Sequence, residues 1–453
     1  MTATKPTNPN MKKILLILFI ALLLLIPITS QALSERTRLN DVNYLIDKLE
    51  KNYAYTWLKK IDWSTLREKY TSLSQTKKTP AEHYELMTKI FKELDDSHSF
   101  IKNPKLKRRF NPGFFVQNLE GKYMVTHVEP ESKAYKMGVR EGLELISEKD
   151  ILVKDLLIDF KKNITGTKQW QEAYSIALLP TIKGSQNYYE TGYFHFKNKK
   201  GSDIKIRLRV PKGIKLLERS FWQWETQQPL LETKTLKNNF AYIKINGFNY
   251  AKNKDTPVSE LFGKMIKAIN NNNRRGLIID LRNSNGGFGE DVTKMVSYFL
   301  PEKTLLRQTC NPKEAGCIVK SKTKLKLTFD YTTTPSLFTF AGPVVLLTNS
   351  YCRSGCEMFA AAFKMKNRAF IIGEQTAGAG GSNSCERLPS GAAFCYTHWP
   401  VVLADGNVVE GVGVKPDLTL KQTLIDFYED KDTVLEEAKK YLESKLTPES
   451  TES

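Results

Sequence analysis

Three stretches in the second half of the chain decide the fold: 276-GLIIDLRNSNGG-287, 343-PVVLLTNSYCRSGCEMFAAAF-363 and 369-AFIIGEQTAGAGG-381. Each begins with an apolar run of strand length and passes directly into a loop rich in small residues. Apolar patterns of helical length follow at 290–300 and 356–365. Strands that alternate with helices predict a layered α/β core, in which ligand chemistry collects in the loops that follow the strands.

The second of these loops carries a candidate nucleophile. Ser354 stands where the loop gives way to a helix, so its hydroxyl can project and the amide of Gly355 can face an oxyanion. The same residues fit a capping box, because Glu357 follows three positions later. The two interpretations are compatible, since a nucleophile can stand at a helix N-terminus. In the first loop, Gly286 and Gly287 allow the backbone to approach a ligand closely.

The first half of the chain has a different sequence pattern. Residues 39–94 carry apolar side chains at helical spacing, and two alternating strands with a turn at 120–121 follow from Gly113. The segment 130-PESKAYKMGVREG-142 resembles a PDZ domain, a module that binds peptide C-termini by strand addition. That resemblance implies a substrate-binding carboxylate cradle in the loop at 111–115, at Gly113, Phe114 and Phe115. A small β domain that binds nothing is the alternative.

The ordered motifs resemble the C-terminal-processing (tail-specific) serine protease family. The matching segments are the Asp-Leu-Arg…Gly-Gly loop, the serine with glutamate three positions on, the Gly-Glu-x-Thr loop and 410-EGVGVKPDLTL-420. With the PDZ-like stretch, the resemblance covers most of residues 95–420. It implies a crotonase-like α/β protease core and peptide-bond hydrolysis, with Ser354 as nucleophile. Gly355 and a glycine of the pair Gly286 and Gly287 would supply the oxyanion hole.

The general base is where this sequence departs from one branch of that family. The processing-protease branch takes a lysine from the third loop, and this chain has Ala379 there. The tricorn-like branch takes a histidine from a region before the PDZ-like domain, and its motif stands here as 94-LDDSHSF-100. The resemblance implies His98 as base and Glu410 as the acid that orients it. The alternatives are His398 as base, Lys364 or Lys366 as a substitute base, His98 as a helix-end residue, and Glu410 as a surface carboxylate.

The N-terminus indicates export. Lys12 and Lys13 precede an uninterrupted apolar run at 14–28, and Ser30 and Ala32 fit the −3 and −1 positions of a signal-peptidase site. We therefore predict a signal peptide over residues 1–32 and a periplasmic or extracellular location. An uncleaved anchor, which would be the chain's one membrane contact, is the alternative.

Six cysteines lie in the second half of the chain, and an even number in an exported protein suggests disulfides. Neighbours in sequence predict the pairs Cys310–Cys317 and Cys385–Cys395. Cys352 and Cys356 flank Ser354, and the sequence leaves them either paired or reduced. The spacings match no zinc finger or ribbon, so we expect no metal and no cofactor.

The net charge of +19 is spread along the whole chain, without the basic cluster and binding module that a nucleic-acid partner would require. We therefore expect protein or peptide substrates and no nucleic acid. The predicted function is an exported serine peptidase, with carboxyl-end processing included, and the alternative is an inactive peptide- or ligand-binding protein on the same fold. The predicted domains are a signal peptide (1–32), a helical region (33–105), a PDZ-like domain (106–215), the protease core (216–425), and a C-terminal helix and tail (426–453).

Overall fold

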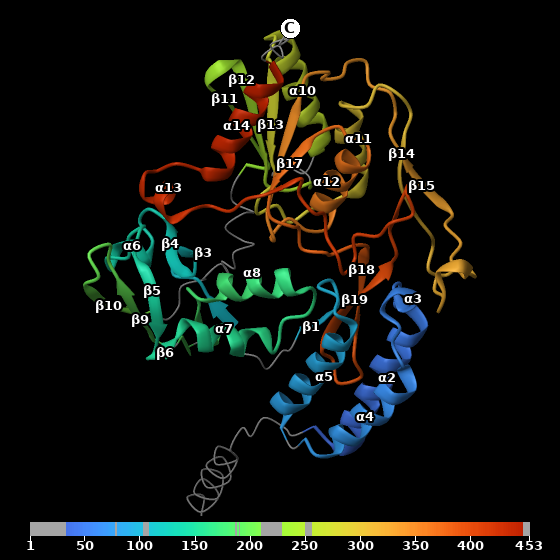
Figure 1. The fold of residues 1–453 in the computed structure, drawn as a ribbon. Coiled ribbons are helices and arrows are strands. Elements are labelled where there is room, and N and C mark those ends of the chain that lie inside the picture. The colour runs from blue at the N-terminus through green and yellow to red at the C-terminus, as the bar shows by residue number, and fades with distance from the viewer. Residues whose placement is uncertain are drawn as a thin grey trace, which may run out of the picture.

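The computed structural model describes residues 33–77, 79–102, 108–185, 188–189, 191–209, 229–249 and 256–446. The predicted signal peptide lies outside the described residues. No helix within them has both the length and the apolar character that spanning a membrane requires. Three lobes are visible in Figure 1: an α/β core, a β lobe and a helical lobe.

The core lobe (residues 229–249 and 256–446) is built on a six-stranded sheet. Its strand order is β11-β12-β13-β16-β17-β21, parallel except for β11 against β12. The central strands are buried along their whole length, as parallel strands covered on both faces are. The strands are β11 (Leu231–Thr235), β12 (Phe240–Ile245), β13 (Gly276–Asp280), β16 (Val344–Thr348), β17 (Phe370–Gly373) and β21 (Leu418–Thr419).

Helices cover both faces of this sheet. One face carries Ile243, Ile279 and Leu346 and packs against three helices, whereas the other carries Ile278 and Val345 and packs against a single helix. The layered α/β core predicted from the sequence is thereby confirmed. The helices of the first face are α10 (Val258–Asn271), α11 (Gly289–Ser297) and α12 (Gly355–Met365); the helix of the second face is α14 (Thr433–Leu446), preceded by α13 (Leu424–Tyr428).

The β lobe (residues 108–185, 188–189 and 191–209) contains a second six-stranded sheet, in which β3 is an edge strand. The turn predicted at 120–121 connects its first two strands. Its strands are β3 (Phe114–Leu119), β4 (Lys122–Val128), β5 (Glu144–Glu148), β6 (Ile151–Leu152), β9 (Thr191–Lys197) and β10 (Asp203–Arg209). The helices are α6 (Lys133–Lys136), α7 (Val153–Lys161) and α8 (Lys168–Leu178), and β2 (Arg108–Phe110), β7 (Ile182–Ser185) and β8 (Tyr188–Tyr189) form a small separate sheet.

The helical lobe (residues 33–77 and 79–94) packs against a hairpin of the core lobe. Phe394 and Tyr396 of this hairpin are buried in one apolar cluster with side chains of these helices. The ribbon places the hairpin beside the helices (Figure 1). The helices are α2 (Glu35–Asn52), α3 (Thr56–Lys59), α4 (Trp63–Gln75) and α5 (Pro80–Leu94). The hairpin is β18 (Ser382–Arg387) with β19 (Ala393–Trp399), and β1 (Phe100–Lys102) pairs with β19.

A further three-stranded sheet, absent from our sequence-based prediction, flanks the core lobe. It consists of β14 (Leu305–Thr309), β15 (Phe329–Thr332) and β20 (Val402–Leu403). Two single 3-10 turns lie at Lys237–Asn239 and Lys322–Lys324. The sheet brings residues from three distant segments to one side of helix α11, where the candidate site lies.

Candidate active site

Ser354 lies at the turn between strand β16 and helix α12. Its φ and ψ are +56° and −123°, a conformation that non-glycine residues rarely adopt and that costs on the order of 1–3 kcal/mol. The Ser354 amide donates to Oε2 of Glu357 at 3.2 Å, which is the glutamate half of the predicted capping box. A disulfide between Cys352 and Cys356 brackets the residue. The strained turn thus exposes the nucleophile candidate at the N-terminus of a helix, as in nucleophile elbows.

Gly286 and Gly287 pack against this turn. Their φ angles are +83° and +146°, and a Cβ on Gly286 would lie 2.5 Å from the amide nitrogen of Gly355. A bridge to Phe248 uses the carbonyl of Gly286 and the amide of Phe288. The amide of Gly287 therefore faces the opposite side, where a Cβ on Gly355 would come within 3.0 Å of its nitrogen. Two amides thus lie side by side next to Ser354, and no backbone carbonyl of the described residues accepts a bond from either.

A hollow of about 300 Å³ opens over this cluster. Ser354, Gly355 and Gly287 form part of its wall, together with the apolar side chains of Met358 and Trp399. Strands β14 and β15 close another side, and none of the residues that line the hollow is acidic. The volume suits one or two side chains of a peptide, and is at the lower end of what small-molecule sites have.

Glu357 fastens the third predicted loop to the turn that carries Ser354. Its carboxylate is fully buried and accepts hydrogen bonds from the amides of Gly378 and Ala379 at 2.7 and 2.8 Å. The Thr376 hydroxyl and the Ser354 amide are its other donors. Burial raises the pKa of Glu357 to about 7, although these hydrogen bonds lower it. The predicted cap residue is therefore also the connection between two loops of the site.

His98 lies in a buried turn that follows helix α5. Asp96 holds this turn by accepting from the His98 amide at 2.8 Å and from the Thr397 hydroxyl of strand β19 at 2.7 Å. The Arg353 side chain, next to Ser354, donates to the Ser97 carbonyl at 3.4 Å, so the turn contacts the nucleophile loop. Burial, and then the nearby Arg353 charge, lower the pKa of His98 to about 4. At neutral pH the imidazole is therefore uncharged.

Gly380 of the third loop lies between His98 and Glu410. Its carbonyl accepts a hydrogen bond from the His98 ring, and its amide donates to Oε2 of Glu410 at 2.9 Å. Nδ1 of His98 has no partner among the described residues. Burial raises the pKa of Glu410 well above its usual range, opposed by Lys59, whose Nζ lies 3.0 Å from Oε1. Glu410 is thus a buried carboxylate that is linked to His98 through the amide and the carbonyl of Gly380. The alternative of a surface carboxylate is wrong.

Comparison with known proteins relates part of the chain to a peptidase family. A family model described as Peptidase family S41 matches residues 239–420, the segment that carries Ser354 and the glycine loops. We refer to residues 239–420, which are similar to this family, as the S41 domain. Proteins named "Probable CtpA-like serine protease" are similar over a longer range. The one from Staphylococcus aureus (strain bovine RF122 / ET3-1) is 27% identical over 340 residues, which is 73% of this chain and 58% of the relative.

The corresponding Staphylococcus epidermidis protein is 24% identical over 391 residues, 85% of this chain and 66% of its own. This chain therefore spans less than two thirds of the length of these relatives. The solved structure of mature CPAF complexed with lactacystin has a TM-score of 0.70 at 16% identity, covering 90% of this chain and 97% of that one. This likeness shows a shared fold that extends beyond the S41 domain.

The other candidates for the base lie in different surroundings. Ala379, at the position of the lysine in one branch of the family, is fully buried with its amide on Glu357. His398, the alternative base on strand β19, has its Nδ1 3.1 Å from the carbonyl of Asn52. Lys364, on the same helix as Gly355, forms an ion pair with Asp417 at 2.7 Å. Among His98, His398 and Lys364, His98 is the one whose turn contacts the loop beside Ser354, through the Ser97 carbonyl and Arg353.

The loop predicted to cradle a substrate carboxylate already has an acceptor on two of its amides. Oδ1 of Asn111 accepts from Gly113 and Phe114 at 2.8 and 3.1 Å. The Phe114 side chain is fully buried in the β-lobe core, while Phe115 packs against the ring of His127. Two of the predicted donors are therefore engaged in this structure, and the cradle remains a prediction.

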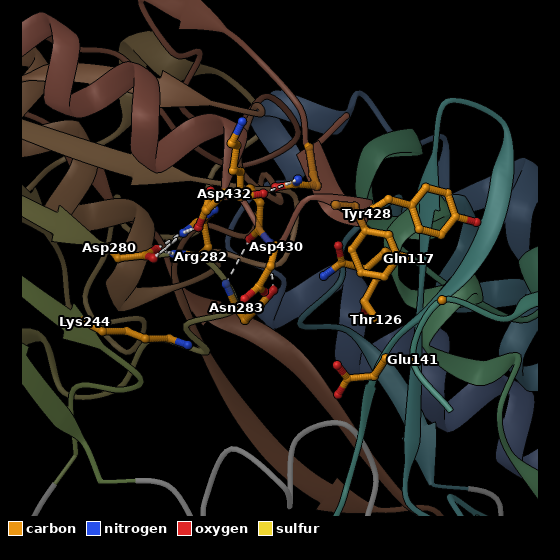
Figure 2. A pocket seen from close by; sticks show the side chains of 15 residues that line it. Gln117, Thr126, Glu141, Lys244, Asp280, Arg282, Asn283, Tyr428, Asp430 and Asp432 are labelled. Carbon is orange, nitrogen blue, oxygen red and sulfur yellow. Dashed lines mark hydrogen bonds and ion pairs between the residues drawn. The ribbon is translucent and has the colours of Figure 1, made fainter. Parts of the chain in front are cut away.

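A larger hollow of about 510 Å³ lies between the S41 domain and the β lobe, away from Ser354 (Figure 2). At its centre Arg282 forms ion pairs with Asp280 at 2.6 Å and with Asp432 at 2.7 Å. These pairs neutralise the buried charges and tie strand β13 to the start of helix α14. We therefore interpret the Asp-Leu-Arg motif as structural.

All six cysteines are paired. The predicted Cys310–Cys317 and Cys385–Cys395 disulfides are present, and the two cysteines that the sequence left open form Cys352–Cys356. The cysteine sulfurs that could bind a zinc ion as thiolates are therefore oxidised to disulfides.

Several residues of the site escaped prediction from the sequence. Lys59, Asp96 and Arg353 act through contacts between segments far apart in the chain, and Arg307 reaches the hollow from an unpredicted strand. Asp96 carried one signal, because an aspartate two residues before His98 can accept its amide. The other three are ordinary basic residues in sequence, and only the fold distinguishes them.

Proposed function

We propose that this chain is an exported serine peptidase that hydrolyses peptide bonds in protein or peptide substrates, including bonds near their C-termini. One observation carries the proposal: Ser354 stands in a strained turn, at the wall of a hollow, with the amides of Gly355 and Gly287 beside it. A nucleophile with two adjacent amide donors is the arrangement that acyl transfer requires. The S41 match and the relatives named serine proteases support the same activity.

In the proposed reaction, Oγ of Ser354 attacks the scissile carbonyl carbon while His98 takes its proton. The amides of Gly355 and Gly287 bind the resulting oxyanion, and Gly286 leaves room for them. The intermediate collapses when the proton passes from His98 to the leaving amine, which breaks the peptide bond and leaves an acyl-enzyme. A water molecule then repeats the sequence and releases the acyl group.

His98 suits the role of base in two ways. Its low pKa keeps the ring neutral at physiological pH, and its Nδ1 has no partner in the described structure while the Gly380 carbonyl orients the ring. We assign to Nδ1 the role of accepting the proton of Ser354. A hydrogen bond donated by one ring nitrogen keeps the ring proton there, which leaves the other nitrogen unprotonated. Glu410 is a positioning residue in this scheme, because it holds the Gly380 amide and through it the carbonyl that orients His98.

The β lobe resembles a PDZ domain, and we propose that it holds substrate tails against edge strand β3. A carboxylate would take the place of the Asn111 side chain on the amides of Gly113 and Phe114. Export is proposed from the charged, apolar and small-residue layout of residues 1–32 and from three disulfides, which persist in oxidising compartments.

Substitution of the nucleophile tests this function. We expect Ser354→Ala to lose peptide hydrolysis by at least about 10³-fold while the fold stays intact, because removal of a triad nucleophile leaves only residual catalysis. Ser350→Ala is the matched control: Ser350 lies in the same loop, but its hydroxyl donates to Glu374. Turnover of a peptide library and a circular-dichroism melt would be measured for both. A Ser354→Ala protein that still hydrolyses peptides, or a wild-type chain that binds peptides without cleaving any, would contradict the proposal.

A further inference from the structure

One charged side chain lies in the wall of the hollow that contains Ser354. Arg307 belongs to strand β14, is only 7% exposed, and lines the hollow together with Gly289 and Tyr331. Its guanidinium lies so close to Gly289 that a Cβ there would overlap it. A positive charge is therefore fixed at the start of helix α11, two residues beyond the proposed oxyanion donor Gly287.

Within the part of the chain that the structure describes, no acidic side chain pairs with Arg307. Its guanidinium carbon lies 4.0 Å from the centroid of the Tyr331 ring. The buried Arg282, by contrast, pairs with two aspartates. Burial lowers the pKa of Arg307, but an arginine stays charged in a protein. A buried charge without a partner costs several kcal/mol, so a residue kept in this state fits a site that an anion enters from outside.

The surroundings favour an anion as well. Helices α11 and α12 both begin at the hollow, with Gly289 and Gly355 as their first residues. Helix N-termini favour negative charge, because their first amides lack acceptors and the helix dipole is positive there. No acidic residue lines the hollow, although acidic side chains lie in the first turns of the two helices, at Glu290 and Asp291 in α11 and at Glu357 in α12.

We propose that Arg307 is a specificity residue that binds a carboxylate of the substrate while the scissile bond lies at Ser354. The carboxylate comes from an aspartate or glutamate side chain near the cleaved bond, or from the substrate's own C-terminus. An arginine can hold either in a bidentate pair. This inference rests on the proposed peptidase function and adds a substrate class to it, namely peptides with a negative charge beside the cleaved bond.

Matched peptides test the inference. The series places Asp, Glu, Asn or Gln at each position next to the cleaved bond, and each peptide is made as a free acid and as an amide. We expect kcat/KM to be about tenfold to a hundredfold higher for the peptide that carries the charge, as a charge-assisted hydrogen bond implies. Arg307→Met should abolish this preference and retain hydrolysis of the neutral peptides, whereas Arg307→Lys should retain part of it.

Arg67→Gln is the control, because Arg67 pairs with Asp47 on the helical lobe, outside the hollow. If kcat/KM is higher for Asp or Glu than for Asn or Gln, the bound carboxylate is a side chain. If it is higher for the free acid than for the amide, the bound carboxylate is the C-terminus. Either result supports the inference. Wild-type protein that cleaves neutral and acidic peptides equally would overturn the inference and leave the peptidase function standing. If no peptide is cleaved, the affinity of Ser354→Ala for labelled peptides tests the inference separately. Equal affinity for acidic and neutral peptides would overturn the inference. A preference for acidic peptides that persists when Arg307→Met is added would overturn it as well.

Discussion

Burial sets the acid–base properties of the two ionisable side chains next to the nucleophile loop, and it moves them in opposite directions. The pKa of His98 falls to about 4, while that of Glu357 rises to about 7, because desolvation disfavours the charged form of each. His98 therefore favours its neutral form, which can accept a proton. Glu357 contributes stability at acid pH that is lost as pH rises through about 7, because the folded state binds its proton more tightly than the unfolded chain does.

The pH dependence of hydrolysis tests His98. Because a base must be unprotonated, kcat/KM should stay level around pH 6 and fall as pH drops through about 4. The contribution of His98 to the stability of the fold decreases between pH 6.5 and 4, since the unfolded chain takes up this proton first, whereas the contribution of Glu357 changes in the opposite direction. Rates must therefore be measured where circular dichroism shows a folded chain.

Matched histidine variants accompany the pH profile. We expect His98→Ala to remove most activity and His398→Ala to have a mild effect. Glu410→Gln should reduce activity less than His98→Ala, because Glu410 acts through Gly380. The opposite ranking of the two histidines would move the base to His398. A rate that rises only above about pH 8 would indicate a lysine with a lowered pKa instead.

At the scale of elements, the loop at 374–381 is the part of the site that organises the rest. Its amides bond to Glu357 at 378 and 379 and to Glu410 at 380, and its carbonyl at 380 orients His98. The sequence predicted a sharp turn here from three glycines, but not these partners. Local pattern reveals that a backbone must turn, whereas the partners Glu357, Glu410 and His98 come from other segments of the chain.

The Cys352–Cys356 disulfide should matter more for activity than for stability. It closes a short loop around Ser354, so its entropic contribution is only about 2 kcal/mol. We expect the double substitution Cys352→Ala/Cys356→Ala to lower turnover strongly, because the strained turn loses its bracket. Cys385→Ala/Cys395→Ala, in the hairpin β18–β19, is the matched control and should lower the melting temperature with a smaller effect on kcat. Equal loss of turnover in both variants at a temperature where both are folded would contradict this role.

At the scale of the whole molecule, the helical lobe and the β lobe each contribute to the site in the core. The helical lobe provides Lys59 and leads into the His98 turn. In the β lobe, the hydroxyl of Thr167, at the start of helix α8, donates to the Ala377 carbonyl at 2.6 Å, and that of Thr165 donates to the Ser99 carbonyl at 3.1 Å. The connection between helices α7 and α8 thus joins the β lobe to the third loop and to the His98 turn.

The sequence predicted the α/β core, its strand-to-helix loops and two disulfides, because each rests on local pattern or on ordered motifs. The hairpin β18–β19, the sheet of β14, β15 and β20, and the pocket residue Arg307 were not predicted. Their positions depend on pairings between distant segments, such as Gln308 with Val402, which no local pattern specifies.

The central claim is that Ser354 is a nucleophile activated by His98. The most direct measurement is labelling of the purified chain with a fluorophosphonate, followed by peptide mapping of the adduct. We expect one adduct, on Ser354, that forms slowly in His98→Ala, at nearly the wild-type rate in His398→Ala, and not at all in Ser354→Ala. A folded wild-type chain that takes up no label, or whose adduct maps to another residue, would contradict the claim.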